Sequence, residues 1–199
     1  MALKCRWQRI NRVRSIKGIS SVIGQRVGLN AKKLSTYLGA HVLEDCGVSF
    51  KLLAHGTSVS MLESLVRLPV FSRRARVFDN VVLHQADADN PGHADWIDRA
   101  RFAKRVYITI NESDHVLKWA DLNFQLDRLG NTCTNLTSKH VRYVDFTNAD
   151  LVQSAHRIYW KSRHNPHIRG FFCSALHGGR AEGGDGISYN ADKNLYYVS

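Results

Sequence analysis

The alternation of strand-like and helix-like segments constrains the fold of this chain more than any other feature. Residues 48–55 contain an apolar run typical of a buried strand, and residues 59–66 then repeat apolar side chains at helical spacing. The strand pattern returns at residues 77–88, 105–110 and 141–146. Because strands that alternate with helices form parallel sheets, the sequence predicts an α/β fold with about four parallel strands and helices on both faces.

The helical segments are expected between these strands and at both ends of the series. We expect helices over residues 29–43, 95–103, 114–129 and 153–161, the third of them ending at Gly130. Residues 164–167, His-Asn-Pro-His, are interpreted as a polar loop.

The chain divides by composition into three parts. Residues 1–33 form a basic N-terminal segment, residues 34–176 form the α/β domain, and residues 177–199 form a glycine-rich tail that ends in the apolar patch Leu195–Val198. A length of 199 residues suits one domain with a sizeable core.

The positive charge of the chain is concentrated near its start. The formal net charge is +11, yet residues 1–33 hold nine basic side chains and no acid, and the rest carries 19 basic against 17 acidic side chains. No aromatic residues interleave with these charges in a recognised binding motif, so a nucleic-acid partner is not favoured over a solvated arm.

The sequence predicts no membrane partner and no bound metal or cofactor. It has no apolar run of about 18 residues and no secretory signal pattern, which favours a cytoplasmic setting. Asp87, Asp89 and His93 are conceivable metal ligands, but a polar loop after a strand more often serves as a turn.

Polar residues follow the predicted strands at the sheet edge where α/β proteins carry their sites. Gly56 and Ser58 follow the first strand, Asp114 the third and His156 the fourth. Nucleophile, acid and base appear in this order in α/β-hydrolases. From the residues alone, a helix cap for Asp114 and a surface position for His156 are the favoured interpretation.

Residues 34–160 resemble the C-terminal two-thirds of a group of bacterial α/β-hydrolase-fold proteins of poorly defined substrate. In that group one strand ends in a motif like L-[AG]-H-S-x-G, a later strand ends in a P-D-x-D-like element, and the next gives Y-x-S-x-x-D-x-A-L. The matching segments are Leu52–Ser58, Ala86–Asp89, Tyr107–Leu117, the Leu129-Gly130 pair, and His156 before Tyr159 and Trp160.

The resemblance implies a hydrolase-type sheet and an esterase-like serine hydrolase site for an ester or amide substrate. It makes Asp114 the acid, His156 the general base, and the backbone N–H of Thr57 an oxyanion donor. The family's serine falls on Gly56, which cannot form an acyl-enzyme. Ser58 is the best remaining nucleophile candidate, although a role at the start of the following helix explains it more simply.

The strands that precede the nucleophile in a complete hydrolase have no counterpart in residues 1–33. We therefore expect a truncated or diverged hydrolase with impaired catalysis, and leave open whether it is an enzyme. The alternative is a non-catalytic α/β binding module, or pseudoenzyme. Sheet edges exposed by missing strands would favour self-association.

Overall fold

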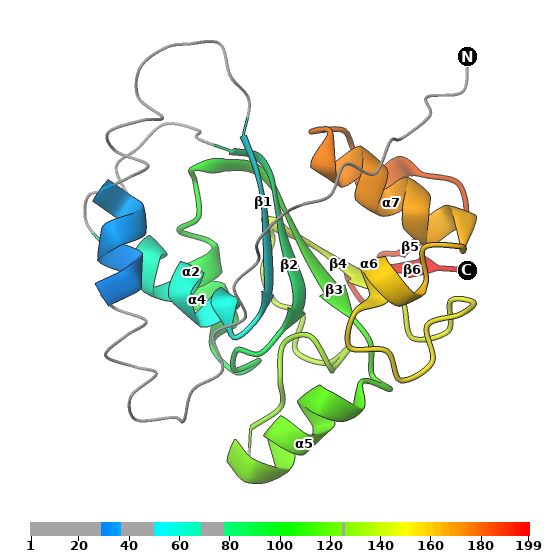
Figure 1. Cartoon of the computed structure of the whole chain (residues 1–199), viewed down its shortest axis with the longest axis horizontal. Coiled ribbons are helices and arrows are strands. Elements are labelled where there is room, and N and C mark those ends of the chain that lie inside the picture. The colour runs from blue at the N-terminus through cyan, green and yellow to red at the C-terminus, as the bar shows by residue number, and fades with distance from the viewer. Residues whose placement is uncertain (1–28, 37–49, 69–77, 125) are drawn as a thin grey trace.

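The computed structural model describes residues 29–36, 50–68, 78–124 and 126–199, and has a six-stranded sheet at its centre (Figure 1). The strand order is β1-β2-β3-β4-β6-β5; β1 to β4 and β6 run parallel, and β5 runs antiparallel to β6. The strands are β1 (Phe50–Gly56), β2 (Phe78–Ala86), β3 (Ala103–Ile110), β4 (Val141–Asp145), β5 (Ile187–Asn190) and β6 (Leu195–Val198).

Helices cover both faces of the sheet, as the alternation of segments predicts. Successive strand residues point to opposite faces, so Val81 and Leu83 of β2 join one core while Val82 joins the other. The first core packs under the helix at residues 29–36, α2 (Ser58–Val66) and α4 (His93–Ile97). The second packs under α6 (Ile158–Lys161) and α7 (Pro166–Leu176), on the other side of Figure 1.

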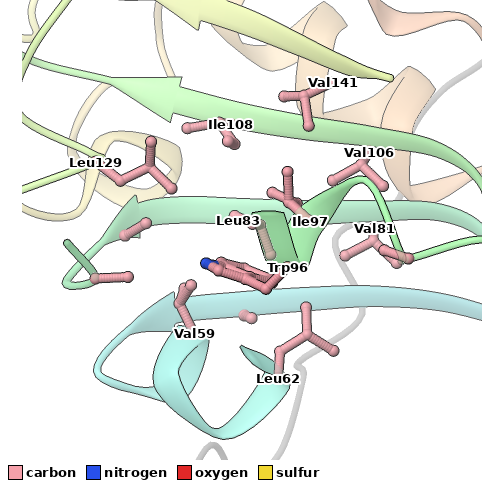
Figure 2. Close-up of a cluster of buried hydrophobic side chains, with 14 of the residues drawn as sticks. Val59, Leu62, Val81, Leu83, Trp96, Ile97, Val106, Ile108, Leu129 and Val141 are labelled. Carbon is pink, nitrogen blue, oxygen red and sulfur yellow. The ribbon is translucent and has the colours of Figure 1, made fainter. Parts of the chain in front are cut away.

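The first core is built from apolar strand residues and the inner faces of the helices that cover them. Figure 2 shows Val59 and Leu62 of α2 and Trp96 of α4 beside the strand residues of this cluster. Val59 has no exposed surface and Trp96 is buried, so both helices are fixed against the sheet. This packing holds the turn between β1 and α2 in place.

The second core contains a helix at a segment where the sequence predicts a polar loop. Residues 164–167 were expected to form a polar loop, but Asn165 caps α7 by accepting hydrogen bonds from the backbone N–H groups of His167 and Ile168. Pro166 fills the first helical position, where a missing N–H costs nothing. Phe171 and Phe172 are then buried among the rings of the second core.

Helix α5 (His115–Phe124) ends before the expected position at residue 129. The chain at Leu129 and Gly130 instead runs along the end of β2, where their N–H groups donate to the carbonyls of Ala88 and Ala86. A Cβ on Gly130 would lie 2.3 Å from the backbone nitrogen of Ala86, so this glycine allows a close backbone approach and does not end a helix.

Two other helices are shorter than expected. Helix α4 ends at Ile97, and residues expected to continue it to position 103 lead into β3 instead. The expected helix over residues 153–161 is formed only by α6, so His156 lies on the loop before it. Of the expected helix over residues 29–43, only 29–36 fall within the described ranges.

The expected tail from residue 177 onward belongs to the sheet, which therefore has six strands and not four. After the 3₁₀ turn η1 (Ala181–Gly183), β5 and β6 form a hairpin, and β6 pairs with β4. Leu195 is buried in the first core and Val198 in the second. Both faces of the apolar patch are therefore buried. A strand of four residues can be buried on both faces only when it joins a larger sheet.

Candidate functional site

The turn from β1 to α2 places a glycine at the carboxyl edge of the sheet. Gly56 ends β1 with φ at +56°, and Thr57 and Ser58 start the helix immediately. A residue with a Cβ is strained in this left-handed region, whereas glycine enters it freely. A sharp strand-to-helix turn of this kind lifts one residue out of the sheet edge toward the loops that follow the neighbouring strands.

Asp114 and His156 form a hydrogen-bonded pair at the same edge. The Oδ2 atom of Asp114 lies 2.7 Å from Nδ1 of His156. The Oδ1 atom of Asp114 accepts hydrogen bonds from the backbone N–H groups of Val116 and Leu117, so it also caps α5. Since a buried carboxylate accepts its hydrogen bond from Nδ1–H, the neutral imidazole presents an unprotonated Nε2.

The loop that carries His156 is held by two amide side chains that the sequence analysis did not identify. Gln85 donates from Nε2 to Oδ2 of Asp114 at 3.0 Å and to the carbonyl of Ala155 at 2.6 Å. Asn111 donates to the carbonyls of Gln153 and Ala155. Both amides are fully buried. Together they fix the backbone beside His156 against the ends of β2 and β3.

Gln85 takes a backbone conformation that is rare for a residue with a side chain. Its φ is +45°, within the strained region for L-residues. Such conformations persist where the surrounding structure determines them. The sequence signal for both residues was an amide at or just after the end of an apolar strand, which is polar where the core pattern predicts apolar side chains.

The imidazole of His156 faces Gly56. A Cβ built on Gly56 would lie 3.8 Å from Nε2 of His156, and this is the one contact within 4 Å apart from the adjoining residues in the described part of the chain. A side-chain oxygen extends about 1.4 Å beyond Cβ, so a hydroxyl at position 56 would reach hydrogen-bond distance of Nε2. The structure therefore brings Gly56 to one ring nitrogen of His156 and Asp114 to the other.

Ser58 is not brought to His156. Its Oγ accepts a hydrogen bond from the backbone N–H of His55 at 2.7 Å and donates to the carbonyl of the same residue at 2.8 Å. Ser58 is the first residue of α2, whose N-cap position is Thr57, so it is not the N-cap either. Its hydroxyl closes the turn around Gly56, and the geometry disfavours it as the displaced nucleophile.

Thr57 directly follows Gly56 and carries the backbone N–H that the family resemblance names as an oxyanion donor. It is the N-cap of α2, and the first N–H groups of a helix have no intrahelical acceptor. The positive end of the helix dipole also favours a negative charge there. This backbone position fits the role that the family resemblance gives it.

Two further histidines, His55 and His84, lie near His156. The His55 ring lies 4.7 Å from the His156 ring and 5.2 Å from the His84 ring. His55 donates from Nε2 to the backbone carbonyl of His156 at 3.0 Å, which adds a contact between β1 and the loop. Burial is the main cause that lowers the pKa of His55 and lowers the pKa of His84 well below 6.5. Both are therefore uncharged at neutral pH.

The other polar residues at the sheet edge are held in structural contacts. Asp87 and Asp89 lie 3.5 and 2.5 Å from Arg128, and both ring nitrogens of His93 are engaged, with the Asn90 carbonyl and the Tyr143 hydroxyl. Within the described ranges, no group of three potential ligands is arranged to hold a metal ion. In the same ranges, no helix has the length and apolar character needed to cross a membrane.

Comparison with known proteins gives no match to this chain: no family model, no curated protein and no solved structure is similar to it. What the site can do therefore follows from its own geometry and chemistry.

Proposed function

We propose that this chain belongs to the serine hydrolase lineage of α/β-hydrolase-fold proteins and has lost its nucleophile at Gly56. One observation carries the proposal: a Cβ at this left-handed position would lie 3.8 Å from Nε2 of His156, whose other nitrogen is held by Asp114. Acid, base and nucleophile position thus have the relative placement of a triad. The four consecutive parallel strands, β1 to β4, support the hydrolase-type sheet.

The proposed site binds an ester or amide but forms no acyl-enzyme. A covalent intermediate needs an oxygen or sulfur nucleophile within reach of the base. Glycine supplies none, and the Ser58 hydroxyl is engaged with the backbone of His55. Acyl transfer through a serine ester is therefore lost, while the groups that would orient and protonate a substrate remain.

Restoring a hydroxyl tests this proposal directly. We expect Gly56→Ser to react with a fluorophosphonate probe, because its Oγ would reach Nε2 of His156 and be deprotonated there. The natural chain and Gly56→Ala serve as controls and should remain unlabelled. Gly56→Ser combined with His156→Gln should also lose the label, since the hydroxyl then has no base.

Labelling is read by mass spectrometry on protein shown to be folded by circular dichroism. A folded Gly56→Ser that stays unlabelled would remove the proposal, because the base or the oxyanion donors would then be misplaced. Labelling of Ser58 in the natural chain would equally contradict it, by making the present protein a serine hydrolase.

The alternative is a non-catalytic α/β binding module. Two features support it. Gly56 has no nucleophilic side chain, and β1 is an edge strand of the sheet in the described residues, where a partner strand could pair. In this case His156 and Asp114 serve only to fix the loop, and Gly56→Ser remains unreactive although it folds.

A further inference from the structure

We infer that His156 of the natural chain activates a water molecule beside Gly56 and hydrolyses activated carboxylic esters directly, without an acyl-enzyme. This inference rests on the proposed function, because it uses the same base and oxyanion donor. It gives Gly56 a role of its own, which is to leave space for the water molecule that attacks the ester.

The space beside Nε2 of His156 suits a water molecule. Outside residues 55–57, this nitrogen is the one atom of the described chain within 4 Å of the position that a Cβ of Gly56 would take, at 3.8 Å. A water oxygen at hydrogen-bond distance from Nε2 fits where a serine Oγ would otherwise lie. With glycine at position 56, a water molecule can therefore take the place that a serine hydroxyl would occupy.

The hydrogen bonding of His156 suits a general base. Asp114 accepts the hydrogen bond from Nδ1 at 2.7 Å, which leaves the lone pair of the neutral ring on Nε2. The backbone beside the ring is fixed by Gln85 through the carbonyl of Ala155 at 2.6 Å. Because His55 and His84 are uncharged at neutral pH, neither opposes the positive charge that His156 acquires.

The reaction balances without any further reactant. The water oxygen forms a bond to the ester carbonyl carbon as Nε2 of His156 takes a proton from the water. The oxyanion of the intermediate lies toward the backbone N–H of Thr57. The carbon–oxygen bond to the leaving group then breaks, and the alcohol leaves with the proton from Nε2, so the carboxylic acid and the alcohol are released together.

Ester hydrolysis by the natural chain tests this inference with 4-nitrophenyl acetate as substrate. We expect His156→Gln to lower kcat/KM by roughly 10²-fold, the usual contribution of a general base. His164→Gln is the matched control, because His164 is an exposed histidine outside the site, and it should leave kcat/KM unchanged. Gly56→Ala should lower kcat/KM although His156 is intact, because its methyl group occupies the space for water.

A second variant tests whether the hydrogen bond from Nδ1 of His156 matters for the reaction apart from the packing of the side chain that accepts it. Asp114→Asn keeps the shape of the side chain, but its amide can donate to Nδ1 and favour the wrong tautomer, so kcat/KM should fall. The time course of the natural chain should be linear, without a burst and without an acetyl adduct on His156 or Ser58.

Two results would overturn this inference while leaving the proposed function standing. One is equal kcat/KM for the natural chain and His156→Gln while Gly56→Ser is labelled by the fluorophosphonate. The other is a burst with an acetyl adduct on His156, which would make the imidazole a nucleophile. A folded Gly56→Ser that resists labelling would instead remove the proposed function.

Discussion

At the scale of single residues, Asp114 makes two sets of contacts that the sequence presents as alternatives. Its Oδ1 caps α5 while its Oδ2 binds His156 and Gln85. A carboxylate has about four acceptor positions, so both roles are compatible. His156 could be paired with it from sequence because each follows a strand. Gln85 and Asn111 could not, because no pattern reveals which loop carbonyl an amide will reach.

His84 should make the stability of the protein depend on pH. The folded ring is fully buried and its pKa is well below 6.5, whereas in the unfolded chain it binds a proton as the pH falls through 6.5. The unfolded state then holds more protons, so the free energy of unfolding decreases as the pH falls below that value. The limiting slope for one such group is about 1.4 kcal/mol per pH unit.

The variant His84→Gln isolates this contribution from those of the other histidines. Urea unfolding of both proteins between neutral and mildly acidic pH should give a shallower pH dependence for the variant, by up to that slope. Identical pH dependence in the two proteins would show that the folded His84 ring accepts a proton as readily as the unfolded one.

At the scale of elements, the sequence predicts best those segments whose apolar residues form a continuous run or recur at helical spacing. Strands β2 and β3 contain such runs, and the apolar residues of α2 recur at helical spacing. Helix α7 is not predicted, although Asn165 and Pro166 form a helix start signal. The histidines on either side of these two residues give the segment the polar composition of a loop. Strands β5 and β6 were missed because each has four residues and depends on β4 for its pairing.

Gly130 and Gly170 should respond oppositely to the same substitution. Gly130→Ala would place a methyl group 2.3 Å from the Ala86 nitrogen, a backbone atom, and should destabilise the protein by roughly 1 to 3 kcal/mol. Gly170→Ala meets no atom within 4 Å on the exposed face of α7 and should stabilise it by roughly 0.5 to 1 kcal/mol.

Urea unfolding at one pH measures both substitutions. If Gly130→Ala left the free energy of unfolding unchanged, residue 130 would not lie as close to the end of β2 as described. That result would also remove the backbone contact that fixes Gln85, whose Cα lies 2.7 Å from the same Cβ position.

At the scale of the whole molecule, the C-terminal hairpin belongs to the folded unit. The glycines of residues 177–199 are typical of a tail, but Leu195 and Val198 of this segment are buried in the two cores on either side of the sheet. The order β1-β2-β3-β4 places every carboxyl end of these strands at one edge. That arrangement, which the alternation of segments did predict, brings Gly56, Asp114 and His156 together.

Leu195→Ala should therefore behave as a core substitution. The side chain has no exposed surface, and its truncation should cost roughly 2 to 5 kcal/mol of unfolding free energy. Lys193→Ala, in the exposed turn of the same hairpin, should change it by less than about 0.5 kcal/mol. Equal, small effects in thermal unfolding would show that the hairpin does not share the core.

A crystal structure of Gly56→Ser decides whether Gly56, His156 and Asp114 have the geometry of a triad. We predict that the new Oγ lies roughly 2.6 to 3.2 Å from Nε2 of His156, while Nδ1 keeps its hydrogen bond to Asp114. A serine hydroxyl turned away from His156 in a folded crystal structure, or a His156 ring separated from Asp114, would contradict the account and leave the three residues neighbours without a shared chemistry.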